Sequence, residues 1–117
     1  MKLNELAERI GAKIITPGKH LTAQIDLVYA GDRMSDLVNH GSDGTLLVSN
    51  LASTQLLRVA ELMDVPGVCL LNGISPEPEL VDAASRQGIL LMVSPAGMFE
   101  TCGLLYQCMV GANKTSQ

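Results

Sequence analysis

The chain has 117 residues, a net charge of −4 and 47% hydrophobic residues. This length and apolar content exclude native disorder and predict one domain over residues 1–117 with a buried core. The acidic balance and the 3% aromatic content argue against binding to nucleic acid or to an anionic membrane. No apolar run approaches the roughly 20 residues of a membrane span. Three cysteines and an acidic start without a signal stretch favour a cytoplasmic protein.

Helices and strands are predicted to alternate along the chain. Apolar residues at helical spacing predict the helices, two of which end at Gly11 and Gly88. Ser75-Pro76 and Ser94-Pro95 each supply an N-cap and a first-turn proline. In chain order we expect helix 3–10, strand 13–16, strand 25–30, helix 32–41, strand 46–48, helix 51–63, strand 68–71, helix 75–87, strand 89–93 and helix 96–110. The polar tail 111–117 is expected to fray.

The four longer apolar runs are almost uninterrupted, and each ends on small or polar residues. Such runs are typical of parallel strands that are buried on both faces, and the segments between them are long enough for crossover helices. The sequence therefore predicts an α/β fold: a three-layer domain with a mostly parallel sheet of about four to five strands and flanking helices. Ligands of open α/β sheets usually bind beyond the carboxyl ends of the strands.

The residues at those strand ends form the candidate ligand site. Asp32 can accept hydrogen bonds from a ribose or another hydroxyl group, and Arg33 can pair with phosphate. The predicted ligand-binding residues are Gly31, Asp32, Arg33, Ser49, Asn50, Asn72, Gly73 and Ser94. A structural alternative is that Asp, Ser and Asn only cap the following helices, while Arg33 and Asp36 form an exposed ion pair. The two interpretations are compatible with each other.

No catalytic residue, metal site or cofactor is predicted. The chain has neither Gly-x-Gly-x-x-Gly nor a P-loop pattern, and no lysine follows a core strand as a phosphoacceptor site would need. His20 and His40 lie in turn-like segments and are expected at the surface. Cys102 and Cys108 are six residues apart, which is not a metal-ligand spacing, and Cys69 lies within an apolar run.

The last predicted helix carries more apolar residues than one buried stripe requires. They are Met98, Phe99, Cys102, Leu105, Tyr106 and Met109. Packing on the sheet alone would account for some of them, whereas a second apolar face would serve a homodimer.

A resemblance to a known family begins at residues 3–11, is clearest at residues 28–38 and continues through 45–49, 67–73 and 88–94. In these segments the chain resembles the DRTGG domain family, which is similar in structure to the N-terminal domain of HPr kinase. It departs at residues 22–28, where Thr-Ala-Gln-Ile-Asp-Leu-Val replaces the motif that names the family. The resemblance implies an α/β domain that often dimerises and has regulatory roles, and any role of the missing motif does not transfer.

These observations predict a non-catalytic, homodimeric regulatory or ligand-sensing module. Its ligand would be small and anionic or nucleotide-like, and it would act on a partner protein that the sequence does not identify. Two alternatives stay open: a small enzyme that uses the strand-end crevice, and a protein-interaction module without a ligand.

Overall fold

The strands form one five-stranded sheet in the order β1-β5-β4-β3-β2. The computed structural model describes residues 1–40 and 42–115. The strands are β1 (Lys13–Thr16), β2 (Leu27–Ala30), β3 (Thr45–Val48), β4 (Gly67–Leu70) and β5 (Leu90–Val93). Strands β2 to β5 are parallel to one another, and β1 pairs antiparallel with β5. The predicted α/β fold with a mostly parallel sheet is confirmed.

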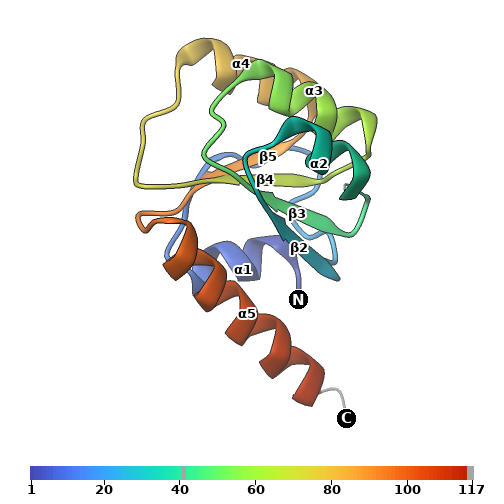
Figure 1. The fold of residues 1–117 in the computed structure, drawn as a ribbon, viewed down its shortest axis with the longest axis vertical. Helices are drawn as coiled ribbons and strands as arrows, with labels where there is room; N and C mark the ends of the chain where they lie inside the picture. Colours follow the sequence, from blue (N-terminus) through green and yellow to red (C-terminus); the bar gives the residue numbers. More distant parts are fainter. Residues whose placement is uncertain (41, 116–117) are drawn as a thin grey trace.

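Helices cover both faces of the sheet and make the fold three-layered (Figure 1). One face carries α2 (Met34–His40), α3 (Thr54–Leu62) and α4 (Pro78–Gln87). The other carries α1 (Leu3–Arg9) and α5 (Met98–Thr115).

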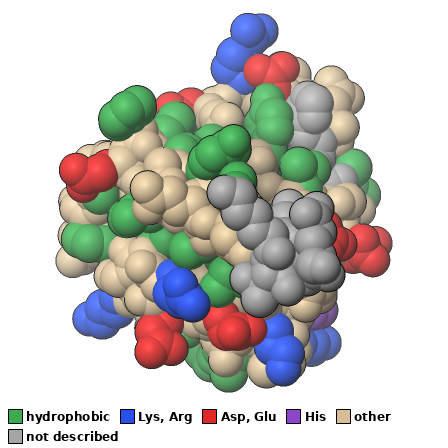
Figure 2. Space-filling model, turned by 90° about the horizontal axis from the view of Figure 1, so that it is seen from below, with side chains coloured by type: hydrophobic (Ala, Val, Ile, Leu, Met, Phe, Trp, Pro, Cys, Tyr) green, Lys and Arg blue, Asp and Glu red, His purple; other side chains and the backbone are tan. Residues whose placement is uncertain are grey.

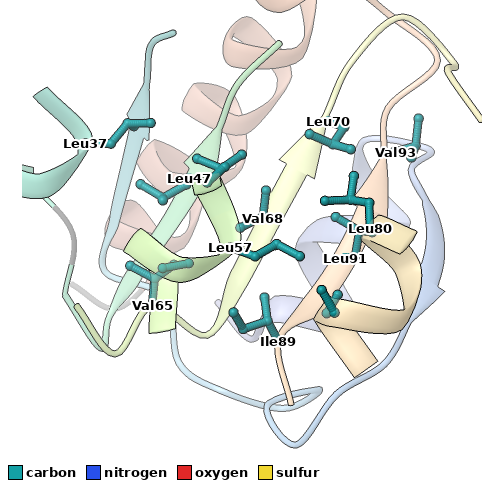
Figure 3. Packing of buried hydrophobic residues seen from close by; sticks show 14 residues of the cluster. Leu37, Leu47, Leu57, Val65, Val68, Leu70, Leu80, Ile89, Leu91 and Val93 are labelled. Carbon is teal, nitrogen blue, oxygen red and sulfur yellow. The ribbon is translucent and has the colours of Figure 1, made fainter. Parts of the chain in front are cut away.

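Each face of the sheet has its own core, because successive side chains of a strand point to opposite faces. On β3, Leu47 packs in the cluster beneath α2, α3 and α4, together with Leu57 and Leu91 (Figure 3). Its neighbour Leu46 packs in the cluster beneath α1 and α5, together with Leu6. The central strands are therefore buried on both sides, as their near-continuous apolar sequences predict.

Several element boundaries differ from the predicted ones. Helix α4 begins at Pro78 rather than at Ser75-Pro76, because Glu77 precedes a proline and adopts an extended backbone (φ −61°, ψ 146°). Helix α3 begins at Thr54, after Ser53, whose hydroxyl accepts the amide of Leu56 at 3.4 Å. Strand β2 begins at Leu27 rather than at residue 25.

Helix α5 begins at Met98 and continues to Thr115, beyond the predicted end at Val110. Gly111 is not among the residues with positive φ, so it does not stop the helix in the way that Gly88 does at φ 72°. Residues 111–115 of the expected polar tail are therefore helical, while 116–117 lie outside the described residues. The same holds for Gly41, at the predicted end of the helix that is now α2.

Helix α5 projects past the sheet and accounts for the elongated extents of 42 × 25 × 25 Å (Figure 1). Seen from below, this end of the molecule shows many hydrophobic side chains, with charged groups mostly toward the margin (Figure 2). Within the described part of the chain, no helix combines the length and apolarity of a membrane span.

Candidate functional site at the strand ends

The carboxyl ends of β2, β3 and β4 bring three exposed polar side chains together. Asp32 follows β2, Asn50 follows β3 and Asn72 follows β4. The parallel register aligns Ala30 with Val48, so residues just beyond these two strands meet at one edge of the sheet. Gly31 extends the alignment, since its amide donates to the Val48 carbonyl at 3.0 Å.

The Asp32 carboxylate is the centre of this arrangement. Its Oδ1 accepts the Asn50 backbone amide at 2.7 Å and the Ser49 hydroxyl at 3.1 Å, and its Oδ2 accepts the Asn50 side-chain amide at 3.1 Å. The Asn50 backbone hydrogen bond, aided by these side-chain bonds, lowers the pKa of Asp32 below its ordinary value despite partial desolvation. Asp32 is therefore an ionised hydrogen-bond acceptor at neutral pH.

Asn72 extends the network to the next strand. Its Nδ2 donates to Asn50 Oδ1 at 3.2 Å. Asn72 and Gly73 have φ values of 62° and 60°, a left-handed pair that Asn and Gly adopt most readily. Their amides donate to Ala96 O and Ser94 O, each at 2.8 Å, which fixes the turn against the loop after β5. We call Asp32, Ser49, Asn50 and Asn72 the strand-end network.

Ser94, the predicted contribution of β5, is not part of this network. Its side chain is fully buried, shares a 2.7 Å hydrogen bond with the Thr101 hydroxyl and accepts the Ala96 amide at 3.2 Å. Ser94 thus joins β5 to α5, and its carbonyl accepts the hydrogen bond from the Gly73 amide of the turn. Thr101 could not be predicted as its partner, because two hydroxyl residues seven positions apart give no sequence signal that they hydrogen-bond in the interior.

Arg33 forms an ion pair with a residue outside the network. Its Nε lies 3.8 Å from Asp36 Oδ2, and its side chain is 81% exposed. The ion pair between Arg33 and Asp36, which was the structural alternative to phosphate binding by Arg33, is therefore present. Capping is different: among the described residues, the hydrogen bonds of the Asp32 carboxylate come from Ser49 and Asn50 rather than from α2.

A cavity of about 390 Å³ lies on the other side of the Asn72-Gly73 turn. Its lining residues are Gly11, Lys13, Ile15, Gly73, Ile74, Ser75, Pro76, Val81, Val93 and Pro95. Only Gly73 belonged to the predicted site. The pairing of Lys13 with Val93 in the antiparallel register places this lysine at the carboxyl end of β5. Its ammonium group makes no ion pair with any residue that the structure describes. Local spacing does not show which strand an edge strand pairs with, so the position of Lys13 beside the end of β5 could not be predicted from the sequence.

The strand-end network places polar groups beside a cavity with a mostly apolar lining, and such an arrangement can form hydrogen bonds with a small molecule. In the described part of the chain, no group of three His, Cys, Asp or Glu side chains is placed to hold a metal ion. Burial raises the pKa of the Cys69 thiol to about 12 and also raises that of Cys102, so neither thiol is activated as a nucleophile.

Comparison with known proteins yields a structural likeness. No family model matches the chain, and no curated protein does. Among solved structures, it is similar to the CBS and DRTGG domains of the regulatory region of Clostridium perfringens pyrophosphatase, complexed with the activator diadenosine tetraphosphate. The TM-score is 0.69 and the sequence identity 15%, with 91% of this chain and 46% of that chain covered. The likeness supports a related fold, and this chain spans about half of that longer one.

Proposed function

We propose that residues 1–117 act as a non-catalytic, homodimeric regulatory module that senses a small anionic or nucleotide-like ligand. The observation that carries the proposal is the strand-end network beside the 390 Å³ cavity. A volume of this size lies within the range of small-molecule sites, which are mostly apolar with a few convergent polar groups. The regulatory region of similar fold binds a nucleotide activator, which is consistent with the proposal.

The charges at the site suggest how such a ligand would lie. The ionised Asp32 would repel an anion but accept hydrogen bonds from hydroxyl groups, such as those of a ribose. Lys13, in the cavity lining, and the exposed Arg33 are the cations available for an anionic group. We expect Gly31, Gly73 and the Ser94 carbonyl to shape the backbone around the ligand. Binding would alter how the dimer presents itself to a partner protein.

The homodimer and the cytoplasmic location are parts of the same proposal. The dimer is supported by the apolar surface of α5, where Phe99 is 93% exposed. The location is supported by Cys69, Cys102 and Cys108, which are all free thiols.

The test is titration with adenosine monophosphate, adenosine and inorganic phosphate, followed by amide NMR shifts. Shifts should centre on residues 31–33, 49–50 and 72–73, and on Lys13 for the phosphate-containing probes. Asp32→Ala should weaken adenosine monophosphate binding by about tenfold or more, the effect of losing hydrogen bonds to a charged group. The matched control is Asp82→Ala, which removes a carboxylate that is 71% exposed on α4. Thermal unfolding checks that both variants remain folded.

Three other outcomes have distinct meanings. Equal losses for Asp32→Ala and Asp82→Ala, or shifts centred elsewhere, would contradict the site. Conversion of adenosine monophosphate during the titration would favour the small enzyme. No shift with any probe, and no retained molecule in a native mass spectrum of fresh protein, would favour the ligand-free interaction module.

A further inference from the structure

The outward surface of α5 is unusual for a chain with so few aromatic residues. The sequence contains one Phe and two Tyr and no Trp. Two of these three, Phe99 and Tyr106, lie on α5 with 93% and 71% of their surface exposed. Aromatic side chains are enriched at protein interfaces, where they often carry most of the binding energy.

Helical spacing places most residues from Met98 to Gly111 in three stripes, while Leu104, which is 37% exposed, and Val110 lie between them. Met98, Thr101, Leu105 and Cys108 face the sheet, where Thr101 and Leu105 are buried. Glu100, Gly103, Gln107 and Gly111 are exposed, and each is polar or glycine. Between these two runs lies the open stripe, made of the exposed Phe99 and Tyr106 and of Cys102 and Met109, which are partly buried and also pack against the core beneath α1 and α5. Its successive spacings are three, four and three residues. That spacing is typical of a helix that packs along a second helix.

The open stripe borders a groove of about 370 Å³ between α5 and the edge strand β2. The groove is lined by Asp26, Leu27, Val28, Ala30, Cys102, Leu105, Tyr106 and Met109. Leu27, on the β2 side, is 49% exposed. Mostly apolar side chains therefore run from the helix to the sheet edge, with Asp26 as the charged residue of the lining.

We propose that the open stripe pairs with the open stripe of a second copy of this chain, with the two α5 helices antiparallel about a two-fold axis. In such a pair, Phe99 of one copy lies opposite Met109 of the other, and Cys102 lies opposite Tyr106. The most exposed aromatic side chain thus meets the groove, since Tyr106 and Met109 both line it. The inference rests on the homodimer of the proposed function and adds its interface.

Charge and size favour a second copy as the occupant. Glu100 is the only charged residue between Met98 and Gly111, and it lies outside the open stripe, so the stripe can face itself without like-charge repulsion. A stable interface buries about 800 Å² on each partner. The exposed fractions of Phe99 and Tyr106, 93% and 71% of roughly 200 Å² each, would supply about two-fifths of that area, and the groove and the remaining stripe residues would add to it.

Two single variants test both the surface and the orientation by sedimentation. Phe99→Asp and Met109→Lys should each weaken the dimer by at least about a hundredfold, because a two-fold interface contains every change twice. When the two variants are mixed, the new aspartate and lysine face each other across an antiparallel pair, and a heterodimer should form. The matched control is Leu62→Asp, since Leu62 is 74% exposed on α3, on the opposite face. It should leave the dimer intact.

The outcomes separate this inference from the proposed function. A wild-type dimer that survives Phe99→Asp, for example through sheet extension at β2, would overturn the interface and leave the homodimer standing. A dimer lost equally in Leu62→Asp, or two monomeric variants that do not associate on mixing, would overturn the antiparallel pairing. A strictly monomeric wild-type chain at high micromolar concentration would overturn the homodimer together with its interface. Ligand binding at the strand-end network is measured independently of all these results.

Discussion

The two faces of the sheet are built from similar buried side chains but present different outer surfaces. Around α2 and α4 the exterior carries ion pairs, Arg33 with Asp36 and Arg86 with Asp82. Leu62, at the end of α3, is largely exposed, and α3 contains no aromatic residue. On the other face, α5 turns Phe99 and Tyr106 outward. The exterior of α2, α3 and α4 is therefore suited to contact with solvent. We expect the exterior of α5 to be covered by association with a second copy of the chain.

The largest expected effect tests whether the two cores are equally well packed. Leu46 and Leu47 are adjacent on β3, both fully buried, and point to opposite faces. Leu46→Ala and Leu47→Ala should each lower the free energy of unfolding by about 2–5 kcal/mol, through lost burial and a residual cavity. Urea denaturation measures both values.

A solvent-exposed leucine gives the control for this pair. Leu62→Ala removes the same atoms from a side chain that is 74% exposed, so its effect should stay within about 0.5 kcal/mol. If either buried variant loses less than about 1 kcal/mol, that face of the sheet lacks a tightly packed core, and the comparison between the layers fails.

An intermediate effect concerns how α5 is held on its layer. Thr101→Val removes one hydroxyl of the buried 2.7 Å pair with Ser94 while keeping the side-chain shape. The loss should be about 1–3 kcal/mol, because the Ser94 hydroxyl stays buried with one partner fewer. The comparison variant is Ser42→Ala, which breaks another 2.7 Å hydroxyl pair, between the exposed Ser42 and the buried Thr45. Because Ser42 lies at the surface, water can replace its hydroxyl as a partner of Thr45, and the loss should be smaller. Thermal or urea unfolding that shows equal losses would contradict a special role for the Ser94–Thr101 pair.

The layers were predictable from the sequence because burial on both faces leaves an unmistakable pattern. Strand β4, for example, is buried at every position, and its four residues are apolar or glycine. The first residues of the helices were harder to predict. Ser75-Pro76 and Glu77-Pro78 offer two possible first turns, and only the backbone restriction before the second proline decides between them.

Of the candidate site, the sequence predicts which residues lie near one another, but not how all of their side chains are arranged. Because parallel strands end at one edge, Asp32, Asn50 and Asn72 could be grouped from the sequence, and the structure joins them by hydrogen bonds. The inward turn of Ser94 depends on Thr101, and the position of Lys13 depends on how β1 pairs with β5. Both are tertiary contacts that local patterns do not encode.

The smallest expected effect tests whether the exterior of the first layer is already complete. Arg86 Nε lies 3.5 Å from Asp82 Oδ2 on α4, and both side chains are 71% exposed. An exposed pair at this spacing contributes about 0.3–0.5 kcal/mol, and a cation in the last helical turn adds a similar amount. Arg86→Gln should therefore cost at most about 1 kcal/mol. The cost should shrink further in high salt, which screens exposed charges.

Urea denaturation at two salt concentrations measures this, and sedimentation should show an unchanged mass. A loss above about 2 kcal/mol, or a change in oligomeric state, would mean that the charged surface of α4 takes part in association, and the contrast with α5 would no longer hold.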